Sequence, residues 1–496
     1  MRKIMKKAIV LLLCAVMALS CFAACAKPDE TQQTDDETTA AETGGVETKD
    51  PNYEADLPEE KFPGDFNILC EGSFWATDAV LYQEEGSEAD NVLDAVWRRC
   101  AVMKDVFGVD ITVTPSADTT SALKNSVKSG DKSYDAICAR MPLIASSAAN
   151  GDLMDLYDAD GLDLSKYYWD QSANEQLSIG HKLFYTVGDI IVTDDQCTWT
   201  MMFNKKIAEA LDLEDLYTVV KENRWTFDYF YSLIKDTGFP KPNDQGEWDY
   251  MASYAFSTHR DMAYGFFYAA GMSFITKDSE DIPFIDPSNN EKIQNILTYS
   301  LKIMRDTQLT IDAHKWVHVD PWATRLTEAA FREDRALFYA EVLNTVTSLR
   351  TMDTDFGLLP VPKYDAAQKE YVTFVNPAAS LIGIPIYHKN DNNARRSGVI
   401  LEALAYYGHE IITPEFYEKA IRGKSTRDIE SLDMLDIILR NRTYDLGLIN
   451  DWGAMSSAYS DLVFNNKNDY ASSFKRTSKS AEKSLNKFLQ KIGVNR

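Results

Sequence analysis

Apolar residues near the start of the folded body follow the two periods that distinguish strands from helices. Residues 66–70 form a short apolar run that stops at Gly72, and residues 109–113 alternate apolar and polar side chains, so both are predicted strands. Between them, residues 91–107 place apolar side chains on one helical face. Residues 134–139 predict another strand after a further helix. Strands that alternate with helices are typical of an α/β layer on a mostly parallel sheet.

The pattern changes in the middle of the chain. Two extended segments, residues 190–192 and 198–203, are predicted on either side of an acidic pair, and mainly helical patterns follow. Strand-like runs return late, at residues 336–339, 356–360 and 381–385. The chain ends on a helical apolar stripe over residues 481–492. Because residues 62–496 are too many for one hydrophobic core, we expect at least two domains.

Residues 1–24 have the pattern of a signal peptide. Basic residues precede the apolar run at residues 8–19, which is too short to span a bilayer comfortably, and small residues follow it. Ala23-Ala24-Cys25 is typical of a lipoprotein cleavage site, so we expect Cys25 to carry the lipid; acylation at Cys21 and ordinary secretion are the alternatives. Residues 25–61 are acidic and contain almost no apolar side chains. We expect them to be a disordered tether that holds the protein at the outer face of the cell membrane.

The charge of the chain is strongly negative. It carries 51 Lys and Arg residues against 76 Asp and Glu residues, a net charge of −25. Removal of residues 1–24 takes away four basic residues, which leaves 47 against 76 and a net charge of −29. Such a surface repels nucleic acid and anionic lipid headgroups, so the composition disfavours both as partners.

Four cysteines follow the expected cleavage site, in addition to Cys25: Cys70, Cys100, Cys138 and Cys197. None of them forms a CxxC pair. Disulfides in one of three pairings are an alternative in an oxidising compartment. Because Cys70 and Cys138 lie in strand-like apolar runs, where buried free thiols are common, we expect free thiols.

The sequence contains none of the common enzyme motifs. The phosphate-cradling GxxxxGK[ST] pattern, GxGxxG, the GxSxG nucleophile turn and HExxH are all missing. His314 and His318 lie four residues apart, as two metal ligands on one helix do, but no third ligand is evident nearby. We therefore expect neither a metal nor another cofactor.

Several short segments follow one another along the body in a recognisable order: SGD and YD within residues 129–135, GDLMDL at 151–156, MFNKK at 202–206, RWTFD at 224–228, FREDRALF at 331–338 and DFGLLPVPKY at 355–364. In order and spacing they resemble the family-1 extracellular solute-binding proteins, the type that serves sugar importers in Gram-positive bacteria. The last segment is the most specific. Asp334 stands where the family usually has Gly.

The resemblance implies a periplasmic-binding-protein-like fold of type II, with two α/β lobes joined by hinge strands and with a helical C-terminus. By analogy the chain crosses between the lobes near residues 193–198, 372–378 and 410–415. The first lobe then comprises residues 62–192 and 377–412, and the second comprises residues 193–376 and 413–496. A ligand would lie in the cleft between the lobes, which close over it.

A sugar ligand requires flat aromatic faces for its C–H surfaces and planar polar side chains for its hydroxyls. Residues in loops that we expect at the cleft supply both types: Trp75, Arg140, Asp195, Trp199, Glu341, Asn344, Asn376 and Trp452. Arg140, for example, follows a predicted strand at the carboxyl end, where α/β folds bind ligands. For each of them the alternative is a structural role in packing or in a salt bridge.

We therefore expect a monomeric binding protein without enzymatic activity that captures a carbohydrate, most simply an oligosaccharide, and delivers it to the permease subunits of an ABC importer. Three alternatives share the compartment and the aromatic content. They are a secreted carbohydrate-degrading enzyme with a catalytic carboxylate pair, a binding protein for a solute other than a sugar, and a receptor that reports its ligand to a signalling sensor.

Overall fold

The computed structural model describes residues 56–72, 81–85, 91–389, 393–420 and 429–494. The predicted signal peptide, Cys25, most of the acidic tether and Trp75 lie outside the described residues. All described residues belong to one compact unit.

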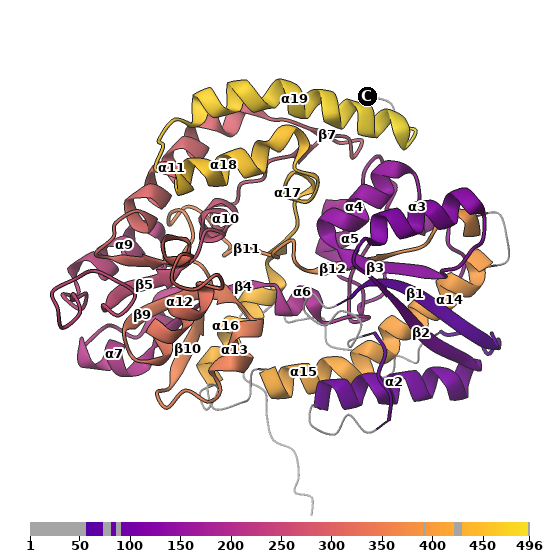
Figure 1. Cartoon of the computed structure of the whole chain (residues 1–496), viewed down its shortest axis with the longest axis horizontal. Coiled ribbons are helices and arrows are strands. Elements are labelled where there is room, and N and C mark those ends of the chain that lie inside the picture. The colour runs from indigo at the N-terminus through magenta and orange to yellow at the C-terminus, as the bar shows by residue number, and fades with distance from the viewer. Residues whose placement is uncertain (1–55, 73–80, 86–90, 390–392, 421–428, 495–496) are drawn as a thin grey trace, which may run out of the picture. The chain divides into compact units, whose positions relative to one another are not determined.

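The first sheet has the strand order β12-β3-β1-β2. Its strands are β1 Gly64–Glu71, β2 Val109–Ser116, β3 Ala136–Arg140 and β12 Ser380–Gly383. β1 runs parallel to β2 and β3, whereas β12 is antiparallel to β3. The flanking helices are α2 Asn91–Phe107, α3 Thr119–Ser129 and α4 Met141–Asn150. The predicted alternation of strands and helices is thus confirmed, and we call this sheet with its helices lobe 1 (Figure 1).

The second sheet has the strand order β10-β4-β9-β5-β8. Its strands are β4 Trp199–Asn204, β5 Tyr254–Thr258, β8 Thr310–Asp312, β9 Ala336–Val342 and β10 Phe356–Leu359. β5 runs parallel to β8 and β9, so the carboxyl ends of these three strands lie at one edge of the sheet. The helices α9 Phe227–Asp236, α10 Met262–Ala269, α11 Asn290–Met304 and α12 Thr324–Arg332 belong to the same half of the molecule, which we call lobe 2. Sheets and helices together confirm the predicted α/β class.

The remaining helices and strands before the C-terminal region belong to both lobes. They are α5 Gln171–Leu177, α6 Thr193–Gln196, α7 Lys205–Ala210, α8 Leu216–Lys221, α13 Asn344–Leu349, α14 Asn393–Tyr407, α15 Thr413–Ala420, α16 Ile429–Arg440, and the two-residue strands β6 Thr276–Lys277, β7 Pro283–Phe284, β11 Thr373–Phe374 and β13 Arg442–Thr443.

Two of the expected crossings between the lobes lie side by side. Thr198 forms an antiparallel bridge with Val375, and the amide of Asn376 donates to the carbonyl of Cys197 at 2.9 Å. β11 in turn pairs in parallel with β13. The extended segment that the sequence predicts at residues 190–192 is instead a turn that leads into the short helix α6, where helical hydrogen bonds satisfy the backbone.

The third crossing differs from the expectation. Residues 410–415 continue helix α14 through a π-helical turn, Gly408–Ile412, into α15. Both the turn and α15 pack against α2 of lobe 1. The chain next forms α16, which packs on β10 of lobe 2, and then β13. The strand that lies beside the other two crossings is therefore β13, which the alternation of apolar residues did not predict.

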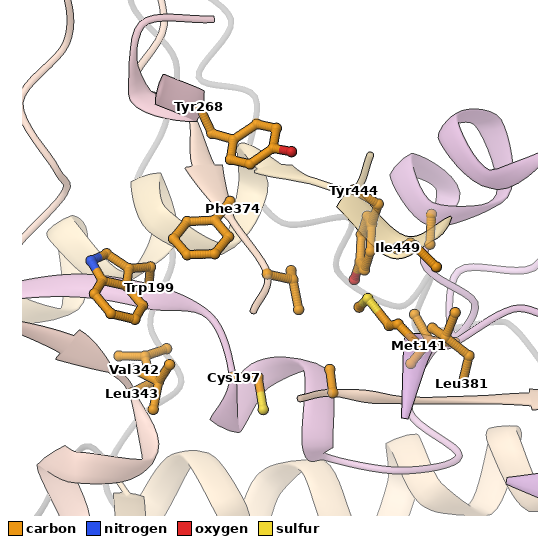
Figure 2. Close-up of a cluster of buried hydrophobic side chains, with 14 of the residues drawn as sticks. Met141, Cys197, Trp199, Tyr268, Val342, Leu343, Phe374, Leu381, Tyr444 and Ile449 are labelled. Atoms are coloured by element: carbon orange, nitrogen blue, oxygen red, sulfur yellow. The ribbon is translucent and has the colours of Figure 1, made fainter. Parts of the chain in front are cut away.

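An apolar cluster joins the crossings to both sheets (Figure 2). Trp199 lies 5.3 Å from Phe374 between ring centroids, and Phe374 stacks on Tyr268 at 5.5 Å. Met141 and Leu381 of lobe 1 belong to the same cluster. Because apolar area removed from water is the main stabilising term, this cluster holds the crossings in place.

The chain ends in helices, as predicted. α17 Leu446–Asn450, a 3₁₀ turn at Trp452–Ala454, α18 Met455–Phe464 and α19 Tyr470–Lys491 follow β13. Asp469 caps α19 by accepting a hydrogen bond from the amide of Ser472. The predicted apolar face is buried at Ala481, Leu485, Phe488 and Leu489. This face packs on α11, α18 and the 3₁₀ turn, so α19 supports the loop at Trp452.

Candidate ligand-binding site

A pocket of about 640 Å³ lies between the lobes and is lined by elements of both. Its size is within the usual range for small-molecule sites. We call it the interlobe pocket. The residues that line it are Arg140, Pro142, Ser146, Ala149, Asp261, Tyr264, Asn376, Pro377, Ala378, Leu448, Ile449, Asn450, Asp451, Trp452, Ser456 and Ser457.

Arg140 provides a fixed cation on the lobe 1 side of the pocket. It ends β3, and its Nε and Nη2 atoms donate to the carboxylate of Glu71 at 2.8 and 2.6 Å. Glu71 ends the neighbouring strand β1 and is buried. The carboxyl ends of these parallel strands therefore bring the two side chains together, as the position of Arg140 after a strand predicted. This fork geometry orients the guanidinium before any ligand arrives.

The hinge contributes an amide on the floor of the pocket. The Nδ2 atom of Asn376 donates to Oδ2 of Asp261 at 2.9 Å, and its Oδ1 atom accepts from the amide of Ala378 at 3.0 Å. Asp261 lies just beyond the carboxyl end of β5. The pair thus joins a crossing segment to lobe 2 at the surface of the pocket.

Asp451 places a carboxylate on the lobe 2 side. Its Oδ1 atom accepts hydrogen bonds from the amide and hydroxyl of Ser456 at 3.0 and 2.6 Å, and its Oδ2 atom accepts from the hydroxyl of Ser457 at 2.5 Å. Asp451 and Ala454 both have positive φ angles, 42° and 58°. Non-glycine residues in this region cost free energy and gather at functional sites.

Two aromatic side chains complete the lining. Tyr264 of α10 donates from its hydroxyl to the carbonyl of Ser456 at 3.2 Å, and burial raises its pKa to about 12. Trp452 lines the pocket but is only 7% exposed, because its ring packs against Phe488 of α19 at 5.5 Å. Trp452 therefore offers little surface to a ligand, whereas Tyr264 is less buried.

The structure brings Arg140, Asn376 and Trp452 together in the pocket, but it does not bring Asp195 there. Asp195 is buried at the crossing, where its Oδ1 atom lies 2.6 Å from Nη1 of Arg442. Asp194 and Asp170 contact the same guanidinium at 3.0 and 2.9 Å. Burial raises the pKa of Asp195 to about 6, and the nearby acidic residues act in the same direction. Its role in this conformation is structural.

Trp199 is also placed away from the pocket lining. It is 0% exposed and lies in the cluster of Figure 2, where its Nε1 atom approaches the sulfur of Met262 at 3.4 Å. Both faces of the ring are covered, so it offers no surface for stacking. The sequence predicted Trp199 at a crossing but could not reveal that this segment lies in a hydrophobic core.

Glu341 and Asn344 lie beyond the pocket lining at the end of β9. Glu341 is buried and its Oε2 atom lies 3.0 Å from Nε2 of His259. Burial opposes protonation of His259, but the Glu341 carboxylate outweighs it and raises the pKa of His259 to about 9. Asn344 begins α13, where its carbonyl accepts a hydrogen bond from Thr347. Trp75, the remaining candidate, is not among the described residues.

Sequence reasoning missed several polar residues of the pocket, among them Asp261, Asp451, Ser456 and Ser457. Asp261 had a usable signal, because it follows a strand at its carboxyl end. Asp451 had none beyond its loop position, since its orientation depends on the positive φ angles of the following turn.

The remaining chemistry within the described residues is limited. No group of three or more His, Cys, Asp or Glu residues there is placed to hold a metal ion. Cys100, Cys138 and Cys197 are free thiols, as expected. No helix among the described residues has the length and apolar character needed to cross a bilayer.

The fold is similar to that of solved substrate-binding proteins, although no family model and no curated protein sequence matches the chain. A cyclo/maltodextrin-binding protein in complex with maltotetraose is 14% identical, covers 88% of this chain and 98% of its own, and has a TM-score of 0.53. A cyclic α-maltosyl-1,6-maltose binding protein from Arthrobacter globiformis is 14% identical, with 86% and 100% covered and a TM-score of 0.53. An ABC substrate-binding protein from Listeria monocytogenes in complex with cycloalternan is 12% identical, with 88% and 100% covered and a TM-score of 0.50. The chain therefore has the two-lobe α/β fold of these substrate-binding proteins.

Proposed function

We propose that the protein is an extracytoplasmic solute-binding protein of the family-1 type and that its ligand is a carbohydrate. The observation that carries the proposal is the interlobe pocket, in which polar side chains from both lobes and from the hinge face one space. The similar solved structures are of proteins described as binding maltotetraose, cycloalternan and cyclic α-maltosyl-1,6-maltose. They support a sugar as the class of ligand for this chain.

The polar groups of the pocket match the chemistry of a sugar. Each sugar hydroxyl both donates and accepts a hydrogen bond, and the pocket offers the donor Arg140, the acceptors Asp261 and Asp451, and serine hydroxyls that do both. These groups are already oriented by bonds to Glu71, Asn376 and the α18 serines. A ligand therefore orders few side chains on binding, which lowers the entropic cost.

Ligand capture would proceed by closure of the lobes about the paired crossings. A ligand in the pocket contacts Arg140 on lobe 1 and Asp451 on lobe 2 at the same time, and these contacts are complete only when the lobes are close together. This difference in contacts is what favours the closed state. The bridge between Thr198 and Val375 keeps the crossings together during the movement.

The cellular context of the proposal rests on the sequence. Cleavage before Cys25, acylation of Cys25 and the acidic tether would hold the binding protein at the outer face of the membrane. From there it would deliver the sugar to the permease subunits of an ABC importer. No catalytic step is part of this function.

Thermal unfolding with a ligand panel tests the proposal. The chain from residue 26 onward, without its lipid, is unfolded in the presence of mono- and oligosaccharides, peptides and small polar metabolites. A ligand at a hundred times its dissociation constant stabilises the folded state by about 2.7 kcal/mol, which raises the midpoint measurably. We expect the midpoint to rise with one class of carbohydrate.

Matched variants locate the binding site in the same experiment. Asn376→Ala, in the pocket, should lose most of the ligand-induced shift, whereas Lys389→Ala, in an exposed salt bridge with Asp158, should keep it. A shift produced only by peptides or other metabolites would refute the sugar assignment. Continuous release of reducing ends from an oligosaccharide would instead favour the alternative of a secreted carbohydrate-degrading enzyme.

A further inference from the structure

An exposed apolar loop follows β8 in lobe 2. It comprises residues 313–323, which we call the rim loop. Trp322 is 67% exposed, Val317 50% and Val319 44%, which makes them prominent among the large apolar side chains at the described surface. Exposed apolar side chains that gather in one place mark binding surfaces more often than isolated ones do.

The rim loop is held in a defined shape by its own hydrogen bonds. The amides of Val319 and Asp320 donate to the carbonyl of Trp316 at 2.8 and 3.1 Å. The amide of Trp322 donates to Oδ1 of Asp320 at 2.7 Å. Trp316 is anchored against Tyr250, with ring centroids 5.6 Å apart. The exposure of Trp322 is therefore built into an ordered turn.

The sheet topology places the rim loop beside the interlobe pocket. β8 and β5 are parallel, so the rim loop leaves the sheet at the same edge as His259, Arg260 and Asp261, the last of which lines the pocket. A hydrogen bond joins this edge of the sheet to the rim loop. The amide of Arg260, the residue before Asp261, donates to Nδ1 of His314 at 3.2 Å.

A second path of contacts runs along α18. The guanidinium of Arg260 bonds Ser460 at 2.8 Å and Asp461 at 2.5 Å, and it lies over the ring of Phe464 at 5.2 Å. The ring of Phe464 is 5.7 Å from that of His314 in the rim loop. On the same helix, Ser457 lines the pocket. A chain of contacts thus runs along α18 from the pocket to the rim loop, polar near the pocket and aromatic further out.

The composition of the rim loop favours one kind of occupant. A membrane surface of anionic lipids is disfavoured by the net charge of −25. The indole of Trp322 presents a flat apolar face with a polar edge, and His318 and Asp320 lie within the same loop. A sugar ring has the complementary pattern, with a C–H face for the indole and hydroxyls for the polar neighbours.

We propose that the rim loop is an outer carbohydrate-binding subsite in which Trp322 stacks on the part of a long oligosaccharide that extends beyond the interlobe pocket. The inference rests on the proposed function and adds to it a preference for long chains. A short sugar would occupy the pocket alone, whereas a longer one would bind both surfaces and gain affinity from the second.

The test is the affinity of wild type and variants for one oligosaccharide series of increasing length, measured by titration calorimetry. Trp322→Ala should weaken binding of the long members roughly tenfold, as loss of a stacked Trp commonly does, and should leave the shortest member that binds within about twofold. Trp322→Phe, which keeps an aromatic face, should retain most of the affinity. Tyr157→Ala, which removes another exposed aromatic ring, in lobe 1 (54% exposed), should change neither.

The outcomes separate this inference from the proposed function. If the wild type binds the series but Trp322→Ala binds long and short members as the wild type does, the outer subsite is refuted and the pocket stands. If Trp322→Ala loses the same factor in affinity for oligosaccharides of every length, Trp322 contributes to binding in the interlobe pocket, and the outer subsite is also refuted. Sedimentation that shows a dimer in the wild type and a monomer in Trp322→Ala, with unchanged sugar affinity, would assign the loop to self-association. If no sugar of any length binds the wild type, the proposed function and the subsite both fail.

Discussion

At the scale of single residues, Glu341 was predicted to bind the ligand but instead forms a buried ion pair with His259. Glu341 is the next-to-last residue of β9, whose residues are all buried, so its carboxylate needs a partner inside lobe 2. His259, just beyond the end of the parallel neighbour β5, supplies that partner at 3.0 Å. The pair lies close to the pocket without lining it, and it makes the stability of lobe 2 depend on pH.

The ion pair of His259 and Glu341 should make the free energy of unfolding depend on pH. The pKa of His259 is raised from 6.5 to about 9, so the charged ring stabilises the folded state fully below about pH 6.5, and this contribution is lost as the pH rises through about 9. His259→Gln should therefore lower the free energy of unfolding by on the order of 3 kcal/mol near pH 6 and by much less above pH 9. Urea unfolding at several pH values measures the difference. The exposed His318→Gln serves as control, and an effect of His259→Gln that is equal at pH 6 and pH 9.5 would contradict the account.

The sequence could predict some site residues and not others for a clear physical reason. Arg140 and Asn376 were identifiable because a strand end and a crossing fix their positions in the chain. Trp199 occupies an equivalent kind of position, yet its ring is buried, because contacts with Phe374 and Met262 come from distant parts of the sequence. Periodicity shows which face of an element is apolar, but it does not show which distant residues cover that face.

At the scale of elements, the turn between α17 and α18 connects folding to the pocket. Gly453 has a φ angle of 65°, and a Cβ atom there would lie 2.3 Å from the backbone nitrogen of Ala481 in α19. The close approach of the turn to α19 is what holds Asp451 and Trp452 at the pocket. Only glycine combines the left-handed conformation with this contact.

Gly453→Ala should therefore damage both stability and binding. The left-handed conformation alone costs a non-glycine residue about 1–2 kcal/mol, and displacement of the α19 backbone adds to that cost. Gly130→Ala is the matched control, because Gly130 has a φ angle of 71° with no atom within 4 Å of the added Cβ. Chemical unfolding should show a larger loss for Gly453→Ala, together with weakened sugar binding that Gly130→Ala does not show. Equal losses of stability with unchanged binding in both would refute the supporting role of α19.

Elements with strong periodicity were predicted correctly, and the exceptions lie at the crossings. The strands at residues 66–70, 109–113 and 336–339 and the final helix agree with the structure. β13 was missed because it is only two residues long and pairs with the equally short β11. Such short strands are specified by the two lobes that they connect, and their own sequence carries little signal.

At the scale of the whole molecule, the two sheets are joined by paired crossings, a shared apolar cluster and one buried ionic group. Arg442 of β13 contacts Asp170 before α5 and the acidic pair of α6, so a single guanidinium ties three segments together. A buried ion pair contributes little net stability, but loss of one partner is costly. This arrangement specifies how the crossings pack.

Binding of a carbohydrate between the two lobes is the core of the proposed function. The most direct test is a crystal structure of the chain from residue 26 onward with the oligosaccharide that gives the largest thermal shift. The account predicts sugar density in the interlobe pocket, with hydroxyls within hydrogen-bond distance of Arg140 on one side and of Asp451 on the other. Sugar bound elsewhere, for example in the second pocket of about 540 Å³ beside Lys277 and Arg440, with the interlobe pocket empty, would contradict it.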